Sequence, residues 1–499
     1  MTQFEQLKNK LAEISDLNAA ASVLGWDQHT YMPGGGAEAR AEQLATLGRL
    51  SHEMFTSDQT GELLETATAE SAALAYDSDE ASLVRVTRRD YDKARRIPPA
   101  LVAEIARTSS LAMEVWVKAK TEANFSAFRP SLEKLLQLHR ELAHCLGFEE
   151  RIYDALLDQY EPGMKTSQLV RIFCQLKSDL VPLVHSISEK RDRVDDSVLS
   201  RHYSGQKQWD FGIEVLRRFG YDLERGRQDK SVHPFTTSFS INDVRITTRV
   251  DEQFLPSALF GTLHECGHGL YEQGIKQALE RTPLAGGASL GIHESQSRLW
   301  ENLVGRSRGF WKFFYFRLQS LFPECLSDTP PDQFYRAINR VEPSLIRVEA
   351  DEVTYNLHIL LRFELEVDLL EDRLSVADLP EAWNAKMKNY LGIVPPDDAK
   401  GVLQDVHWSN GLIGYFPTYS LGNILSVQLF EKAHAADPLL HSQIGHGEFG
   451  ALLEWLREKV HCHGRKFLPA ELLDGAGIHL SAEPYINYLR NKYSEIYGI

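Results

Sequence analysis

The chain has 499 residues, 43% of them hydrophobic and 25% charged, which is typical of a soluble globular protein with a sizeable core. Its formal net charge of −16 argues against nucleic acid or an anionic membrane as the main partner, because phosphate groups would be repelled. The five cysteines are scattered and contain no C-x-x-C pair, so we expect a reducing, cytoplasmic location.

From residue 1 to about 230, apolar residues recur every three or four positions, which predicts a helical half. The clearest predicted helices are Ala81–Arg96, Pro99–Glu122, Ser131–Leu146 and Thr166–Arg191. The first residues form a charged amphipathic helix without the apolar region of a signal peptide. The aromatic segment from Trp26 to Pro33, which three glycines follow, predicts a shaped loop between helices.

The spacing of apolar residues changes after His233-Pro234-Phe235. Apolar residues then alternate with polar ones on both sides of an Asn242-Asp243 turn, which predicts a β-hairpin from about Phe239 to Val250. In zinc peptidases, a strand before the metal-binding helix can pair with an extended substrate. The hairpin could equally serve only to support the helix that follows, and both interpretations stay open.

His264 and His268 lie four residues apart in a stretch that is predicted to be helical from Pro256 to Gly274. On a helix, residues four apart share one face, so both imidazoles can bind one metal ion. Glu265 lies close enough to act on a water molecule without displacing it. This is the H-E-x-x-H pattern of zinc hydrolases, although two incidental histidines on a helix would give the same spacing.

A catalytic zinc ion needs a third protein ligand and an open position. The best candidate is Glu294, on a second predicted helix after the loop from Thr282 to Ser289. His293 is the rival ligand, but a helix presents only one of two adjacent residues to the metal. Gly267 weakens the first helix and also allows another segment to approach it closely.

The chain after Glu294 is again predicted to be helical, with helices at Gly309–Phe322 and Pro331–Arg340. The stretch from Ile346 to Tyr355 contains three carboxylates and Arg347, a composition that usually marks a solvated helix face.

The stretch from Val406 to Phe430 has almost no charge, but its proline and glycines make it a poor membrane span. We interpret it as a buried loop and helix near the active site. His407, Tyr415 and Tyr419 are hydrogen-bond donors of the kind that stabilise an oxyanion, and each one alone could also be an ordinary core residue.

Six short motifs occur in a characteristic order between residues 233 and 408. They are His233-Pro234-Phe235, Asp243-x-Arg245-x-Thr247, His264-Glu265-x-x-His268, His293-Glu294-Ser295-Gln296, Ile346-Arg347-x-x-Ala350-Asp351 and Gly401-x-x-Gln404-Asp405-x-His407-Trp408. Together with the early aromatic segment, this set closely resembles the M32 family of metallocarboxypeptidases, the thermostable carboxypeptidase type. The resemblance covers nearly the whole chain and has no departure at the metal positions.

The resemblance implies a mainly α fold of two helical lobes around a long central cleft, as in the helical oligopeptidases. A small β-hairpin or sheet would lie beside the H-E-x-x-H helix. We expect one peptidase domain with a mostly helical half (1–230), a metal-site and substrate-cleft segment (231–425) and a C-terminal helical cap (426–499). Family members are usually homodimers, so we expect one here.

For the chemistry, the resemblance implies His264, His268 and Glu294 as ligands of one divalent metal ion and Glu265 as general base. Zinc is the default metal, with cobalt or manganese as the alternatives.

For the substrate, the resemblance implies Arg347 as the anchor of the free C-terminal carboxylate, which a guanidinium can bind with two parallel hydrogen bonds. It places His407, Tyr415 or Tyr419 near the scissile bond. We also predict substrate contacts for Arg245 and His233, which belong to two of the motifs.

The predicted function is therefore a metal-dependent carboxypeptidase that releases single C-terminal residues from peptides, with neither a nucleic acid nor a membrane as partner. The alternatives are an oligopeptidase or dipeptidyl carboxypeptidase with the same metal centre, and a non-catalytic peptide-binding scaffold that retains a structural metal. The intact Glu265 argues against the scaffold, because a purely structural site needs no base beside its ligands.

Overall fold

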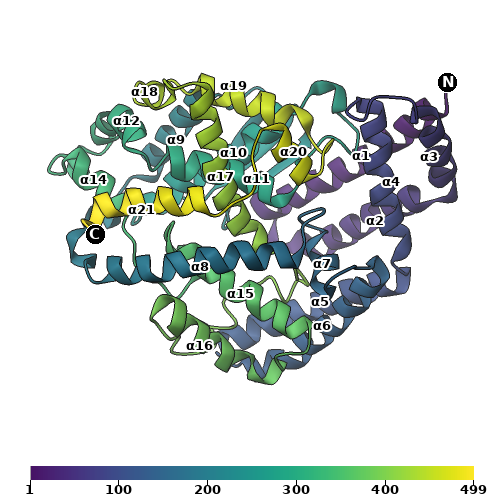
Figure 1. Cartoon of the computed structure of the whole chain (residues 1–499), viewed down its shortest axis with the longest axis horizontal. Coiled ribbons are helices and arrows are strands. Elements are labelled where there is room, and N and C mark those ends of the chain that lie inside the picture. The colour runs from purple at the N-terminus through teal and green to yellow at the C-terminus, as the bar shows by residue number, and fades with distance from the viewer. Residues whose placement is uncertain (1) are drawn as a thin grey trace. The chain divides into compact units, whose positions relative to one another are not determined.

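The computed structural model describes residues 2–499 and is mainly helical, with one small sheet (Figure 1). The predicted fold class is thereby confirmed in its helical content and its sheet. The chain forms two compact units, each assembled from three separate segments. Unit 1 comprises Met1–Arg95, Asp196–Ile338 and Gln428–His479, and unit 2 comprises Arg96–Asp195, Asn339–Val427 and Leu480–Ile499.

Unit 1 contains the sheet, the H-E-x-x-H helix and most of the shorter helices. Its α-helices are α1 (Gln3–Thr30), α2 (Ala37–Thr56), α3 (Asp58–Ser71), α4 (Asp79–Arg96, which ends at the boundary), α9 (Gly205–Phe219), α10 (Leu255–Gly274), α11 (Leu290–Arg298), α12 (Arg308–Leu321), α13 (Pro323–Leu326), α14 (Pro331–Ile338), α18 (Leu440–Ile444), α19 (Gly450–Lys459) and α20 (Pro469–Gly475). A π-helical segment, η5 (Leu299–Val304), continues α11, and short 3-10 turns are η1 (Gly34–Gly36), η3 (Ser197–Ser200), η4 (Gln277–Leu279) and η8 (His461–His463).

Unit 2 consists of helices and short turns. Its helices are α5 (Pro99–Thr121), α6 (Phe125–Leu146), α7 (Ile152–Leu157), α8 (Thr166–Ser188), α15 (Thr354–Leu370), α16 (Leu379–Leu391) and α21 (Glu483–Tyr497), with the 3-10 turns η2 (Arg191–Arg193), η6 (Arg347–Glu349) and η7 (Val376–Asp378). Helix α17 (Pro417–Ala436) begins in unit 2 and ends in unit 1. The helices predicted from apolar spacing all occur, with ends that differ by a few residues.

Helix α1 is longer than the sequence indicated. It runs to Thr30, so most of the predicted loop from Trp26 to Pro33 is the last part of a helix. Trp26 is buried and its ring packs edge-on against Phe239 of the sheet, with 6.5 Å between ring centroids. Burial of this ring stabilises the helix beyond the point where local sequence would end it.

The sheet has three strands in the order β1-β3-β2, namely β1 (Gly226–Lys230), β2 (Thr236–Ser240) and β3 (Asp243–Thr248). Strands β2 and β3 are antiparallel and form the predicted hairpin, while β1 pairs with β3 in parallel and was not predicted. At Gly226 a Cβ atom would lie 2.2 Å from the backbone oxygen of Val244, so this strand pairing requires a glycine there.

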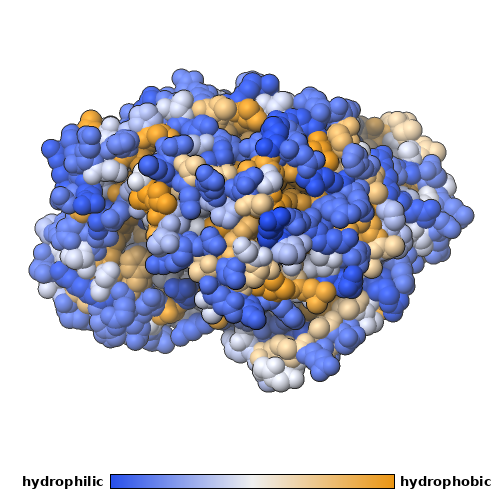
Figure 2. All heavy atoms as spheres, turned by 90° about the horizontal axis from the view of Figure 1, so that it is seen from below, coloured by the Kyte–Doolittle hydropathy of each residue, from blue (hydrophilic) through white to orange (hydrophobic). Residues whose placement is uncertain are grey.

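Hydrophilic side chains predominate on the face shown in Figure 2, and hydrophobic residues form small separate patches among them. Within residues 2–499, no helix combines the length and hydropathy that a membrane span requires. The uncharged stretch from Val406 to Phe430 is a loop followed by the first part of α17, and most of it is buried, as expected.

Candidate metal centre

The two histidines of the H-E-x-x-H motif lie on one face of α10, with 5.0 Å between their ring centroids. The helix begins as predicted, with Pro256 in its first turn, where a missing N–H costs nothing. Its apolar side chains Leu259, Leu263 and Leu270 are buried, so packing fixes the rotation of the helix.

Gly267 allows α11 to lie directly against α10. A Cβ atom at this position would lie 2.5 Å from the backbone oxygen of Gln296 and 2.6 Å from Cα of Ser297. These distances are too short for any side chain, which confirms the expected close approach of a second segment. Ser289 caps α11 by accepting a hydrogen bond from the N–H of Ile292. The cap and the close packing together place Glu294 opposite the two histidines.

Three side chains converge on one point. Oε2 of Glu294 lies 3.6 Å from Nε2 of His264 and 3.5 Å from Nε2 of His268. Zinc binds nitrogen and oxygen ligands at about 2.0–2.2 Å in a tetrahedron, which separates the ligand atoms by roughly 3.3–3.6 Å. The donor set and the separation of Glu294 from each histidine therefore fit a zinc-like ion with three protein ligands and one open position, the arrangement of a catalytic site.

The charges of His268 and Glu294 favour a bound cation. Burial lowers the pKa of His268 to about 3, so its ring is neutral and its Nε2 can present a lone pair. Burial alone would raise the pKa of Glu294, but Arg298 and His264 bring it well below its usual value, and the group is a carboxylate. The Glu294 carboxylate is held by Nε of Arg298 at 2.7 Å and by the hydroxyl of Ser297 at 3.1 Å.

The outer nitrogen of His264 bonds to a carboxylate that the sequence analysis missed. Nδ1 of His264 lies 2.9 Å from Oε2 of Glu301, which Arg298 also contacts at 3.2 Å. Glu301 lies in the π-helical segment η5, directly after α11. The sequence motifs do not show which residue after Glu294 contacts His264. Glu301 could be identified only once the packing of α10 against the segment after α11 was known.

His293, the rival third ligand, does not join the three converging atoms. Its Nδ1 lies 2.6 Å from Nδ1 of His268, and its Nε2 lies 2.8 Å from Oε1 of Glu272. His293 therefore contacts His268 at Nδ1, the ring nitrogen that does not face Glu294.

Glu265 lies beside the candidate ligands and is only 6% exposed. Its Oε2 accepts a 2.7 Å hydrogen bond from the hydroxyl of Thr236 in β2, which also bonds to the backbone oxygen of Glu265. Burial raises the pKa of Glu265, although His264 and the Thr236 hydrogen bond oppose that rise. A buried carboxylate with a raised pKa is a suitable general base.

Strand β2 thus supports the H-E-x-x-H helix α10, which was one of the two interpretations of the hairpin. The other also keeps a structural basis, because β2 is at the edge of the sheet and no further strand pairs with it within residues 2–499. The backbone oxygen of Phe235 accepts from the N–H of Thr247, so by alternation Thr236 and Ser238 direct their backbone groups to the outer edge.

Two further predicted residues of unit 1 lie in or next to the sheet. Arg245 forms a two-point ion pair with Asp243, with both distances 2.9 Å, and its guanidinium stacks 4.4 Å from the ring centroid of Trp26. His233 is exposed in the segment between β1 and β2, and its backbone oxygen accepts from the hydroxyl of Ser231.

The remaining predicted residues form a second group, in unit 2. The stretch from Ile346 to Val353 is not the predicted solvated helix, because it contains only the single turn η6. Arg347 is 5% exposed, and its Nε donates to Asp405 at 2.9 Å. Its Nη1 donates to the hydroxyl of Tyr355 at 2.8 Å. Burial would lower the pKa of Arg347, but Asp405 and Tyr355 raise it above its usual value, so the buried guanidinium stays charged. Sequence composition alone does not reveal these partners.

Asp405 also pairs with a second buried arginine. Nε of Arg362 lies 2.6 Å from Oδ2 of Asp405, so two guanidinium groups share one carboxylate. Burial would raise the pKa of Asp405, but Arg347 and Arg362 hold it far below its usual value. The sequence analysis missed Arg362, since nothing in its apolar helix marks it as a partner of Asp405.

His407, Tyr415 and Tyr419 lie together beside this arginine pair. Nε2 of His407 is 3.1 Å from the hydroxyl of Tyr419, and the ring of Tyr415 packs against both. Burial and the neighbouring guanidinium of Arg347 lower the pKa of His407 to about 3, although Asp405 opposes the shift, so the ring is neutral.

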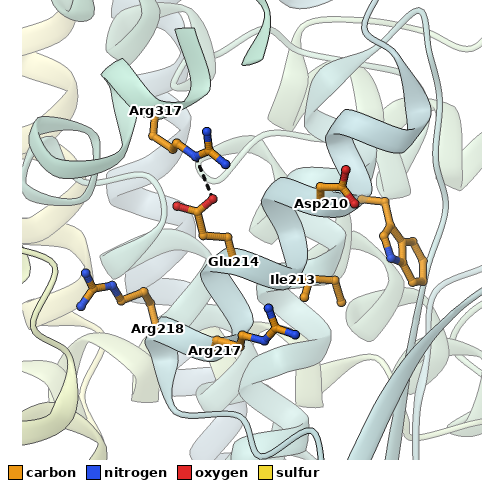
Figure 3. A pocket seen from close by; sticks show the side chains of 7 residues that line it. Asp210, Ile213, Glu214, Arg217, Arg218 and Arg317 are labelled. Atoms are coloured by element: carbon orange, nitrogen blue, oxygen red, sulfur yellow. Dashed lines mark hydrogen bonds and ion pairs between the residues drawn. The ribbon is translucent and has the colours of Figure 1, made fainter. Parts of the chain in front are cut away.

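A surface hollow on unit 1 lies outside both groups (Figure 3). It is lined by α9 and by Arg317 of α12, which forms a 2.8 Å ion pair with Glu214. None of the predicted site residues lines it.

Comparison with known proteins identifies the class of enzyme. A family model described as carboxypeptidase Taq (M32) metallopeptidase matches residues 6–493. The chain belongs to the M32 family. M32 enzymes are metallopeptidases, so a metal ion belongs to the active protein, and the chain is a metallocarboxypeptidase, as predicted.

The similarity to M32 relatives extends over the full length of the chain. Thermostable carboxypeptidase 1 of Thermus thermophilus is 45% identical, over 99% of each chain. Carboxypeptidase 1 of Bacillus subtilis is 41% identical, over 98% of this chain and 97% of the relative. The crystal structure of an M32 carboxypeptidase from Deinococcus radiodurans R1 superposes with a TM-score of 0.97 at 43% identity, and each chain is covered completely.

Proposed function

We propose that this M32 enzyme removes single residues from the free C-terminus of peptides, at one divalent metal ion held by His264, His268 and Glu294. The observation that carries the proposal is the convergence of these three donors at zinc-like spacing beside the buried Glu265. Zinc is the expected metal, and cobalt or manganese would suit the same donors. When bound, such an ion polarises the scissile carbonyl and makes a nearby water molecule more acidic.

Glu265 is the proposed general base. Its Oε2 is occupied by the hydroxyl of Thr236, so Oε1 is the oxygen that takes the proton from the attacking water. The same oxygen then returns the proton to the leaving amine. The outer edge of β2 offers backbone N–H and C=O groups to an extended peptide, which would orient the bond to be cleaved. Arg245 and His233 are the proposed side-chain contacts in this part of the substrate site.

Arg347 is the proposed anchor for the terminal carboxylate. Support for this assignment comes from charge, because Arg347 and Arg362 share the single carboxylate of Asp405 and leave one positive charge in excess. Since Arg347 is almost fully buried and already paired, a peptide carboxylate would share its guanidinium with Asp405.

His407, Tyr415 and Tyr419 supply the proposed donors near the scissile bond. A neutral imidazole and two phenols can stabilise an oxyanion without adding a charge to the arginine pair. We further propose a cytoplasmic homodimer with the three-part organisation predicted from the sequence. The five free cysteines accord with a reducing compartment.

The deciding experiment is a mass-spectrometric time course on one peptide in free, N-acetylated and C-amidated forms, with and without a chelator. Stepwise loss of C-terminal residues from the free and acetylated forms, abolished by amidation or chelation, is the expected result. Internal cleavage that ignores amidation would indicate an oligopeptidase, and absence of cleavage with any metal would indicate a scaffold.

Two variants test the residue roles. Glu265→Gln is expected to retain the metal and lose about 10²–10⁴-fold in turnover. Arg347→Ala is expected to impair cleavage of peptides with a free carboxylate. A fully active Glu265→Gln enzyme would remove the general-base assignment, and unimpaired cleavage by Arg347→Ala would remove the anchor.

A further inference from the structure

The two histidines of the candidate metal centre have different partners at their outer nitrogens. His264 faces a carboxylate, Glu301, at 2.9 Å. His268 instead faces another imidazole, with 2.6 Å between its Nδ1 and Nδ1 of His293. Behind that ring, Nε2 of His293 lies 2.8 Å from Oε1 of Glu272. A chain of hydrogen bonds therefore runs from His268 through His293 to Glu272.

Only one placement of protons satisfies this chain with neutral rings. A carboxylate can only accept, so the proton between Glu272 and His293 resides on Nε2 of His293. Nδ1 of His293 then carries a lone pair and must accept from Nδ1–H of His268. Nε2 of His268 is left without a proton and faces Oε2 of Glu294 at 3.5 Å. That is the form in which an imidazole binds a metal.

We propose that His293 is a positioning residue that holds His268 in its metal-binding tautomer and orientation, and that Glu272 in turn holds His293. This inference rests on the metal centre of the proposed function. It assigns His293 a role distinct from that of a ligand, and it couples Glu272, two turns along α10 from His264, to the metal.

The packing around His293 leaves its ring little freedom to turn. The ring of Tyr271 lies 5.0 Å away between centroids. A Cβ atom at Gly287 would lie 2.7 Å from Cδ2 of His293 and 3.2 Å from Cε1 of Tyr271, so the glycine makes room for both rings. The side chains of His293 and Glu272 are 19% and 12% exposed, respectively. A ring held this firmly can transmit its orientation to His268.

Two substitutions separate this role from simple packing. In His293→Asn, the side-chain oxygen can occupy the position of Nδ1 and still accept from His268, although the side chain is smaller. In His293→Gln, the amide reaches the position of Nε2 and can still contact Glu272, but no acceptor remains for His268. A packing role favours the larger glutamine, whereas a positioning role favours asparagine.

The experiment measures zinc and cobalt affinity by competition with a chromophoric chelator, together with the visible absorption bands of the cobalt-loaded protein. We expect His293→Gln to bind both metals about 10–100-fold more weakly, with shifted cobalt bands. His293→Asn is expected to remain within a few-fold of the wild type and to keep its bands. Thermal unfolding of the metal-free proteins verifies that both variants fold.

Other outcomes would overturn the proposal in distinguishable ways. Wild-type affinity and spectra in both variants would show that His293 does not act on the metal. Weaker binding by His293→Asn than by His293→Gln would assign His293 a packing role. If the wild-type protein bound neither metal, the metal centre itself would fail, and this inference with it.

Discussion

A single hydroxyl group links the sheet to the proposed base. Thr236 in β2 donates a 2.7 Å hydrogen bond to Oε2 of Glu265, which is otherwise buried. A hydrogen bond to a charged group contributes about 1.5–3 kcal/mol, and here it also selects which carboxylate oxygen is free. The orientation of the base is therefore determined by a strand residue outside the H-E-x-x-H motif.

Thr236→Val tests this link, since it keeps the shape of the side chain and removes the hydroxyl. We expect kcat to fall about 10–100-fold, because Glu265 loses the contact that orients it, while metal affinity stays unchanged. Steady-state kinetics and chelator competition measure the two quantities. Thr236→Ser, which retains the hydroxyl, is the matched control and should retain most of the activity. Equal losses in both variants would contradict the prediction.

At the level of single residues, the sequence predicted which three candidate ligands converge but not the contacts behind them. His264, His268 and Glu294 do converge, because helix periodicity alone places the histidines on one face and the loop length allows α11 to return. The sequence did not indicate that His264 would contact Glu301, or that His268 would contact His293. It also did not indicate that Asp405 would pair with two arginines. Those contacts join side chains on different elements and depend on packing, which has no local sequence pattern.

Among the elements, α10 and α11 depend on a close contact at Gly267. Gly267→Ala would place a Cβ atom 2.5 Å from the backbone oxygen of Gln296 and push the helices apart. We expect lower thermal stability and a metal affinity reduced at least about tenfold, because Glu294 would move from the histidines.

Gly261→Ala in the same helix is the control for Gly267→Ala. The nearest atoms to its added Cβ lie at 3.7 Å, so the substitution should be neutral or stabilising by up to about 1 kcal/mol through helix propensity. Thermal unfolding and chelator competition measure both variants. A Gly267→Ala protein that matched Gly261→Ala in both assays would refute the argument from close approach.

Helix α15 contains a buried acid whose ionisation opposes folding. Glu366 accepts hydrogen bonds from Tyr153, Trp408 and the N–H of Gly414, yet burial raises its pKa to about 7. In the unfolded chain its pKa is about 4.3. The folded protein therefore holds the proton more tightly, and stability is lost as the pH rises from about 4.3 to about 7.

The prediction for Glu366 is a pH-dependent difference between the wild type and Glu366→Gln, which does not titrate. From pH 5 to pH 8 the wild type should lose about 2–3 kcal/mol of unfolding free energy relative to the variant. Urea unfolding at both pH values measures this difference. A difference that stays constant with pH would show that Glu366 has an ordinary pKa in the folded protein.

The elements that the sequence failed to predict are those whose stability comes from their neighbours. Strand β1 has the sequence Gly-Arg-Gln-Asp-Lys, without an apolar residue, so no alternation marks it, and it exists because β3 pairs with it. The last turns of α1 exist because Trp26 is buried against the sheet. The hairpin and α10, in contrast, carry their own periodic patterns and were predicted closely.

For the whole molecule, the division into two units has a measurable effect. The three candidate ligands all lie in unit 1, so metal binding should stabilise that unit directly. We expect hydrogen exchange in α10, α11 and η5 to slow by about 100-fold at a metal concentration of 100 Kd, with a smaller change in α8 of unit 2. Exchange mass spectrometry of chelator-treated and metal-loaded protein tests this. Equal slowing in both units would contradict it.

Because unit 1 is assembled from three separate segments of the chain, it cannot complete its folding until the last of them has been synthesised. His461 of η8 packs against the ring of Tyr271 in α10 and bonds to Gln296 in α11, at 2.9 Å, so a late segment completes the surroundings of these two helices. At about 5–20 residues per second, translation produces this segment roughly 10–40 seconds after α10 has been made. A nascent chain therefore exposes its histidines and glutamates to cellular metal ions well before the fold that selects among those ions is complete.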